Sequence, residues 1–291
     1  MTDSIHYSLP LLNAHPQVKN RRLFYVDLTR CIALFLTVFA HLYSADSKVR
    51  LYVYAFHMPL FFLLSGYLHK DFQLGDLVRK VMRRLLVPFT FFMFLGYLYF
   101  VVSSRNLRPD IILGSIRGII LGKSILANDI LWFLLALFFV KVIGNLFILY
   151  PQTAGVPTLL LFVLFNFSKH NWLYLGSAFM ALPFYLIGHY GKKIIQSVCQ
   201  VRYRLLLAGL LLSISALLSS FNGKVSMMAT VFGNTGNGLL DIILFYLNAL
   251  VGSLSIMCLS ASIPSFGHLV CLIATSSISI VGLHFGVKYG S

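Results

Sequence analysis

Long apolar runs alternate with short polar segments along almost the whole chain. A membrane-spanning helix needs about 20 mostly apolar residues, because each residue rises about 1.5 Å through a hydrocarbon layer about 30 Å thick. The runs that we expect to be spans are 23–43, 51–68, 85–102, 129–150, 157–168, 172–190, 203–219, 238–260 and 268–288. The fifth is short for a bilayer and fits a broken or tilted helix. The pattern predicts an all-α integral membrane protein, a polytopic bundle of about 9–10 transmembrane helices.

The segments between the runs carry the charge that orients such a bundle. Residues 69–84 contain five Lys or Arg, and residues 191–204 contain four. Because cytoplasmic loops are enriched in Lys and Arg, both segments are expected on the cytoplasmic side, together with an N-terminal tail formed by residues 1–21. Residues 103–128 are also basic but would lie outside. Their stretch 111–122 is therefore expected to be interfacial or re-entrant.

Composition supports a membrane protein and narrows its partners. The 291 residues are 58% hydrophobic, and the formal net charge of +15 arises from 23 Lys and Arg against eight Asp and no Glu. In a soluble chain this balance would suggest nucleic acid, but in short loops it suits anionic lipid headgroups or a phosphorylated ligand. The four cysteines have no metal-binding spacing, and the N-terminus lacks the pattern of a cleavable signal. Without a repeat or a linker, we expect a single transmembrane domain over residues 22–291.

The first apolar run holds ionisable residues at unusual depth. Only ten residues separate Arg30 from His41, and ten helical residues rise about 15 Å, half of a bilayer core. Asp27, Arg30 or His41 must therefore lie in the hydrocarbon, where an arginine costs about 2.5–3.5 kcal/mol on insertion scales. Eleven steps of about 100° put Arg30 and His41 on one helix face, and Asp27 can pair with Arg30 one turn away. Either this pair is structural, with His41 at headgroup level, or the face lines a functional site.

Two more histidines lie inside apolar runs. His57 precedes Pro59, which frees a backbone carbonyl in the preceding turn and favours a kink. Gly66, near the end of the same run, suits close contact between helices. The order of the spans puts His284 in the outer half of the membrane, like His41 and His57. A lone membrane histidine can simply hydrogen-bond to a neighbouring helix, but three at one depth suggest a polar cavity.

Several segments resemble the membrane acyltransferase family 3. That family opens with Asp-x-x-Arg, ten residues and a His, a pattern present in YVDLTRCIALFLTVFAH (25–41). FHMPLFFLLSGYL (56–68) is similar to its second helix, especially in the fucose 4-O-acetylase-like branch. Weaker similarity lies in RRLLVP (83–88), LWFLLALF (131–138), LPFYLIGHYGKK (182–193) and SSISIVGLH (276–284). Family members often continue for another helix after the last segment, so the domain is expected to lack a final helix.

This resemblance implies an integral-membrane O-acyltransferase of the bacterial inner membrane, with a cytoplasmic N-terminus. Such enzymes move an acyl group, commonly acetyl, from acyl-CoA to a sugar hydroxyl of a cell-surface polysaccharide or its lipid-linked precursor. No permanently bound cofactor and no metal are implied. The expected partners are acetyl-CoA or another acyl-CoA as donor substrate, the glycan or lipid-linked acceptor and membrane lipids, with no nucleic acid.

The donor is expected to bind basic residues. Coenzyme A carries several phosphates, and the guanidinium group of arginine suits phosphate. Arg79, Lys80, Arg83 and Arg84 are therefore candidates for its anchor, unless this cluster acts only as a topology signal. Arg83 and Arg84 fall in the region of the family's cytoplasmic arginine motif. The usual Arg-x-x-Arg spacing is replaced here by Lys80-x-x-Arg83.

The catalytic candidates are His41, Arg30 and Asp27. Arg30 and His41 match the essential arginine and histidine of the family. With a reference pKa of about 6.5, His41 can act as a general base, or it can carry the acyl group covalently. Arg30 is expected to steer donor phosphate or to orient the site through Asp27. His57 and His284 are candidates for binding the acceptor.

Two other functions agree with parts of the same pattern. Membrane histidines and a short fifth span also suit a proton-coupled transporter, although a two-fold repeat is missing. A non-catalytic scaffold, or an inactive or truncated acyltransferase remnant, would keep the fold without the chemistry. Transfer of labelled acetyl to a glycan separates these functions from the enzyme.

Overall fold

The computed structural model describes residues 24–44, 47–104, 109–123, 125, 128–167, 171–264, 270, 272–274 and 276–283. Over these ranges the secondary structure is helical, and the β-contact found is an isolated antiparallel bridge between Ser226 and Val231. The all-α prediction is therefore confirmed. The expected N-terminal tail and His284 lie outside the described residues.

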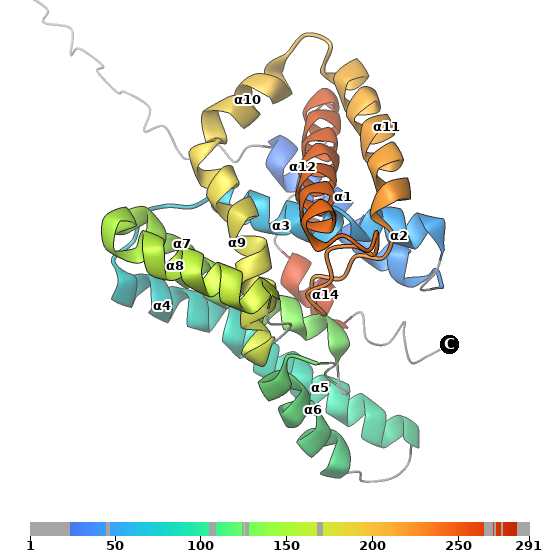
Figure 1. Ribbon diagram of the computed structural model, residues 1–291. Helices are drawn as coiled ribbons and strands as arrows, with labels where there is room; N and C mark the ends of the chain where they lie inside the picture. The colour runs from blue at the N-terminus through green and yellow to red at the C-terminus, as the bar shows by residue number, and fades with distance from the viewer. Residues whose placement is uncertain are drawn as a thin grey trace, which may run out of the picture.

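The helices follow one another through short connections (Figure 1). Their bounds are α1 Phe24–His41, α2 Lys48–Tyr54, α3 His57–Tyr67, α4 Leu74–Val81, η1 Met82–Leu86, α5 Val87–Ser104, α6 Pro109–Leu121, η2 Asp129–Leu131, α7 Trp132–Leu149, α8 Pro151–Phe167, η3 Trp172–Tyr174, α9 Leu175–Tyr190, α10 Lys192–Gln200, α11 Arg204–Asn222, α12 Gly238–Ser262 and α14 Ser277–Leu283. Each expected apolar run coincides with a helix over its described part. The chain is thus a multi-pass membrane protein.

Fewer helices than expected are long enough to cross a membrane. Six helical segments of the described chain have the required length and apolar composition. They are Phe24–His41, Lys48–Tyr67, Leu74–Ser103, Trp132–Leu149, Arg204–Asn222 and Gly238–Ser262. Of the other three expected spans, α8 and α9 have 17 and 16 residues, and the last is described only in part. The segment expected to be interfacial or re-entrant is α6, with 13 residues.

The second apolar run is broken into α2 and α3. The break lies at Ala55 and Phe56, where i to i−3 hydrogen bonds replace the helical ones. Pro59 accounts for this position, because its ring clashes with the carbonyl four residues earlier and its missing N–H costs nothing in the first turn of α3. The predicted kink is therefore present. It makes His57 the first residue of α3, with a side chain that is 2% exposed.

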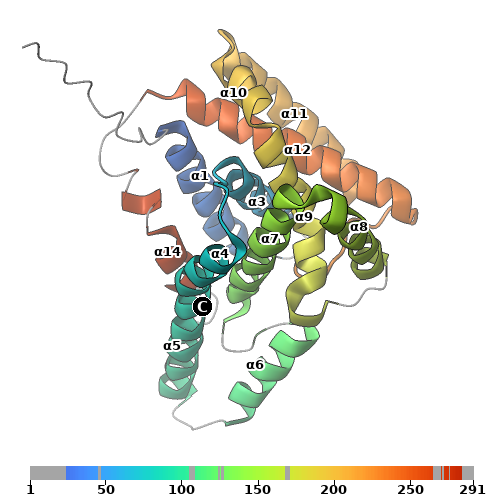
Figure 2. The ribbon, with the colours of Figure 1, turned by 90° about the vertical axis from the view of Figure 1, so that its left-hand side faces the viewer.

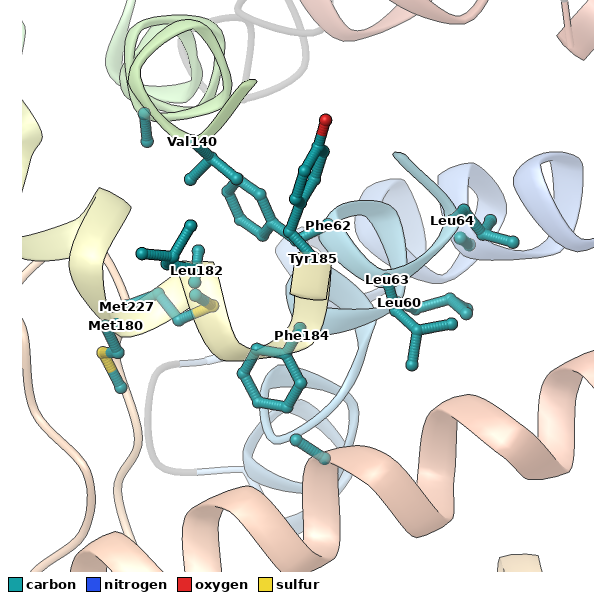
Figure 3. Packing of buried hydrophobic residues seen from close by; sticks show 14 of the residues in the cluster. Leu60, Phe62, Leu63, Leu64, Val140, Met180, Leu182, Phe184, Tyr185 and Met227 are labelled. Carbon is teal, nitrogen blue, oxygen red and sulfur yellow. The ribbon is translucent and has the colours of Figure 1, made fainter. Parts of the chain in front are cut away.

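Helices α3 and α9 form the centre of the core. Their backbones approach so closely that a Cβ atom on Gly66 would lie 1.8 Å from the Tyr185 carbonyl oxygen, and one on Gly188 would lie 2.1 Å from that of Leu63. Figure 3 shows side chains of α3, α7 and α9, with Val140 from α7, filling the space around this contact. Gly66 thus makes the close helix contact that the sequence predicted.

A continuous rod is formed by α4, η1 and α5, in which η1 is a π-helical turn. Helices α5 and α6 extend away from the rest of the bundle (Figure 1), whereas α4 and η1 pack against α7. The span expected at 85–102 therefore begins earlier, at Leu74. A π turn inserts an extra residue into a helix, and such turns occur often at functional sites.

The two strongly basic segments lie at the same end of the bundle. The rings of His69 and His189, which follow α3 and close α9, are 5.1 Å apart, and the Lys192 ammonium lies 5.4 Å from the centre of the Tyr67 ring. The starts of segments 69–84 and 191–204 thus lie close together, as expected for segments on one side of a membrane. We call this the basic end.

Candidate active site

Helix α1 carries the first three candidate residues. Arg30 Nη1 lies 3.5 Å from Asp27 Oδ1, so the predicted ion pair is present. The Asp27 side chain is 10% exposed and that of Arg30 is 34% exposed. His41 closes the helix, eleven residues beyond Arg30, which corresponds to about 16 Å along the axis. Arg30 and His41 therefore belong to different parts of the site.

A cavity of about 580 Å³ lies at the basic end, bordered by α1, α3, α4, η1 and α7. Figure 2 shows these helices around the junction of α4 and α5. The cationic side chains in its lining are Arg30, Lys70, Lys80, Arg84 and Lys141. No carboxylate is among the lining side chains that the structure describes. Like charges repel strongly where water is scarce, so an anion in this cavity would be stabilised.

The predicted basic cluster is divided between two faces. Lys80 and Arg84 line the cavity, whereas Arg79 and Arg83 are absent from its described lining; Arg84 is exposed, as Arg79 and Arg83 are. Lys80 also lies over the Phe72 ring, with the ammonium 4.0 Å from its centre. Only half of the four candidates are therefore brought to the cavity.

Lys141 is a cavity residue that sequence reasoning missed. It lies near the middle of α7, where it is the one charged residue among 18, and it is only partly exposed. A lone cation inside a membrane span is by itself a signal of function. That signal was available in the sequence.

Part of the cavity lining is apolar. Phe61 and Leu64 of α3 and Phe133 of α7 belong to it, and the Phe61 and Phe133 rings are 5.6 Å apart. His57 lies four residues before Phe61, which is one turn further along α3 or about 6 Å. The lining therefore combines cationic and apolar side chains, and on α3 it comes within about one turn of the buried His57.

His41 and His57 are brought together by Tyr54. The Tyr54 ring lies 4.9 Å from the His57 ring and 5.9 Å from the His41 ring, and the Tyr54 hydroxyl is 3.3 Å from His41 Nε2. His41 Nδ1 lies 2.7 Å from the Thr37 carbonyl oxygen, and His57 Nδ1 lies 2.8 Å from that of Val53. A carbonyl only accepts, so both Nδ1 atoms carry hydrogen, and each neutral ring keeps its lone pair on Nε2.

Arg50 completes this cluster. Its Nη2 lies 3.2 Å from the Tyr54 hydroxyl, its Nη1 donates to the Tyr43 carbonyl at 3.0 Å, and its guanidinium lies 4.9 Å from the centre of the Tyr54 ring. Sequence reasoning missed both Arg50 and Tyr54. Arg50 directly precedes the expected second span, and Tyr54 lies three residues before His57, a spacing that shares a helix face.

His69 lies in the connection between α3 and α4 and lines the cavity. Its side chain is 3% exposed, its Nδ1 is 2.6 Å from the Tyr185 hydroxyl, and its Nε2 is 3.5 Å from Asp71 Oδ1. Burial, reinforced by the nearby His189, lowers the pKa of His69 to about 4. The His69 ring is therefore neutral at pH 7 and adds no charge to the cavity lining.

Metal binding is not indicated by this site. Among the residues that the structure describes, no three His, Cys, Asp or Glu side chains are grouped as metal ligands. The polar groups are arranged as a cationic cavity and a cluster of two imidazoles, a hydroxyl and a guanidinium, in which His57 lies about one helical turn from Phe61 of the cavity lining. Acid–base chemistry near a bound anion is what such groups can perform.

Together with six helices fit to cross a membrane, these features define a multi-pass membrane protein with a cationic cavity and a neighbouring pair of histidines. Residues 23–287 match the family model described as an acyltransferase domain, and the chain belongs to the membrane acyltransferase family 3. The match confirms the family that the motifs of the first two helices predicted. No curated protein and no solved structure matches the chain.

Proposed function

We propose that the protein transfers an acyl group, normally acetyl, from acyl-CoA to a sugar hydroxyl of a cell-surface polysaccharide or its lipid-linked precursor. Family membership supports the acyl-transfer chemistry. The observation that carries the proposal is the cavity, whose cationic and apolar lining residues match a thioester with a phosphorylated head and an uncharged arm. The donor is a substrate that leaves as CoA, and no resident cofactor takes part.

In this proposal the donor phosphates bind at the basic end, which faces the cytoplasm of a bacterial cell. Lys80, Arg84 and Lys141 hold them, with Arg30 next to its partner Asp27 and Lys70 at the rim. The pantetheine arm passes Phe61 and Phe133, so that the thioester reaches the neighbourhood of His57. Anchoring by remote phosphates holds the reacting carbonyl in place and lowers the barrier through orientation.

His41 then acts as the general base. Its Nδ1–H is held by the Thr37 carbonyl, so Nε2 is the atom that takes up a proton, and a hydroxyl group already lies 3.3 Å from this atom. His57 has the same tautomer and contributes to holding the acceptor. We place His284 in the same role on sequence grounds alone.

The acceptor class follows from the second motif. FHMPLFFLLSGYL (56–68) is similar to the fucose 4-O-acetylase-like branch, which favours a deoxysugar hydroxyl as the acceptor. Mass spectrometry of the envelope glycans of cells with and without the gene identifies the sugar. Loss of acetyl from a deoxysugar supports this branch, and loss from another sugar rejects it.

The reaction itself is tested with purified protein, labelled acetyl-CoA and envelope glycan from cells that lack the gene. Wild type should label the glycan, and His41→Ala should still bind acetyl-CoA, because the cavity is intact, while transfer falls about 10²–10⁴-fold. A burst of CoA release without acceptor would instead indicate that His41 carries the acyl group covalently. Glycan labelling that is equal in wild type and His41→Ala would reject the proposal, as would no labelling at all.

A further inference from the structure

Tyr54 occupies the atom through which His41 would act. Its hydroxyl lies 3.3 Å from His41 Nε2, and in the neutral ring with hydrogen on Nδ1 this nitrogen bears the lone pair, so that the hydroxyl is then the donor. Arg50 Nη2 donates to the same hydroxyl oxygen from 3.2 Å. The hydrogen bonds therefore run in one direction, from the guanidinium to the phenol and from the phenol to the imidazole.

Orientation of His41 does not require this hydroxyl. The Thr37 carbonyl, 2.7 Å from Nδ1, already fixes the tautomer and the plane of the ring. A second hydrogen bond at Nε2 leaves this fixed tautomer unchanged and competes with any acceptor hydroxyl for the lone pair. An acceptor must then either displace Tyr54 or deliver its proton through it.

We propose that Tyr54 is a further catalytic residue, whose hydroxyl passes the proton of the acceptor hydroxyl to His41 while Arg50 stabilises the phenol oxygen. This inference rests on the proposed function and concerns the same reaction. Arg50 is half-buried, and its guanidinium also stacks at 4.9 Å on the Tyr54 ring, so it stays beside the oxygen that becomes transiently negative. Arg50 acts through Tyr54 and is therefore a positioning residue.

The step balances without another reactant. The acceptor O–H bond breaks and its proton bonds to the Tyr54 oxygen, as the Tyr54 proton moves to His41 Nε2. The acceptor oxygen bonds to the thioester carbonyl carbon, and the carbon–sulfur bond then breaks. The thiolate takes the proton back from the His41 imidazolium through Tyr54, so the products are the ester and the free thiol of CoA.

The test compares Tyr54→Phe with Tyr52→Phe in the full-length protein, using labelled acetyl-CoA and envelope glycan from cells that lack the gene. Tyr52 is a matched control on the same short helix, because its hydroxyl bonds to the Leu212 carbonyl at 3.2 Å and not to the histidine site. Tyr54→Phe should lower kcat about 10²-fold with the donor KM unchanged. Tyr52→Phe should stay within about twofold of wild type.

A proton inventory separates relay from positioning. Transfer rates in mixtures of H₂O and D₂O should give a bowed plot for wild type, because two protons move together, and a straight one for Tyr54→Phe. Arg50→Gln keeps the Tyr54 hydroxyl and should lower kcat about tenfold while the plot stays bowed. Retained binding of acetyl-CoA shows that each variant is folded. If Tyr54→Phe does not fold, the kcat and the plot of Arg50→Gln provide the test instead.

The outcomes are distinct. A wild type that labels no glycan overturns the proposed function and the relay with it. An active wild type together with Tyr54→Phe within twofold of it overturns the relay alone and means that the acceptor displaces Tyr54. A straight wild-type plot overturns the relay as well.

Discussion

At the residue scale, the free-energy cost of placing the charged Lys141 side chain inside a membrane helix most needs an explanation. A lysine at the centre of a membrane helix costs about 2.5–3.5 kcal/mol on insertion scales, and the described lining of its cavity offers four more cations and no carboxylate. Unless an anion binds, the protein would be more stable without this charge. Lys141 therefore has the energetic character of a ligand-binding residue rather than a structural one.

Lys141→Met separates these two roles, because its effects on stability and on donor binding should have opposite signs. Without donor, the unfolding midpoint in detergent should rise, since an uncompensated charge is removed. The donor KM should increase about 10- to 100-fold, because a hydrogen bond to a charged group contributes about 1.5–3 kcal/mol. Lys193→Met, which removes an exposed charge at the basic end, should change neither. A Lys141→Met protein with unchanged donor KM would remove this residue from the binding site.

His69 makes the stability depend on pH. Its folded-state pKa, lowered to about 4 by burial, lies below the reference value of about 6.5, so the neutral ring stabilises the folded protein. This contribution is complete above pH 6.5 and is lost as the pH falls from there toward 4, because the unfolded chain binds the proton first. The unfolding midpoint measured from pH 7 to pH 5 should fall less for His69→Asn than for wild type. Equal slopes would mean that other groups cause the acid sensitivity.

At the scale of the element, the rod of α4, η1 and α5 presents different cations on different sides. Lys80 and Arg84 line the cavity, and Arg79 and Arg83 do not. The double variant Lys80→Gln/Arg84→Gln should raise the donor KM at least tenfold with a smaller change in kcat, as expected when ground-state binding is lost. Arg79→Gln/Arg83→Gln removes the same charge from the same segment and should leave the donor KM within about twofold. Steady-state kinetics with varied acetyl-CoA measure the donor KM of both double variants. Equal changes in the donor KM would favour a role of these cations in membrane topology.

The same rod shows where sequence reasoning reaches its limit. Apolar periodicity predicts the helices, Pro59 predicts the break before His57, and Gly66 predicts the contact with α9, because each of these depends on local chemistry. The i, i+4 spacing groups Lys80 with Arg84 and Arg79 with Arg83. Which of the two pairs faces the cavity depends on how α4 and η1 pack against α7, and the sequence does not announce this packing. Lys141 was recognisable from its apolar surroundings alone. Tyr54 and Arg50 were harder, since their role depends on α2 folding back against the end of α1.

At the scale of the molecule, the site has two ends that a donor and an acceptor can approach separately. The cavity lies at the basic end and is lined by Arg30, whereas His41 lies about 16 Å along α1 from Arg30. In the proposed reaction, the bundle therefore separates the phosphates of a soluble donor from the reacting hydroxyl. Such a separation suits a membrane enzyme whose donor is made inside the cell and whose acceptor is displayed outside.

This arrangement predicts that donor and acceptor act from opposite sides of the membrane. In proteoliposomes, acetyl-CoA, which does not cross the bilayer, should support transfer only from the side exposing the basic end. An impermeant thiol reagent reports the orientation in a variant without its native cysteines. Lys193→Cys marks the basic end, and Lys224→Cys marks the segment between α11 and α12 at the other end. Labelled glycan should appear on the side of residue 224, and detergent should abolish the dependence on side. Equal transfer with donor on either side of intact vesicles would show that the two substrates share one entrance.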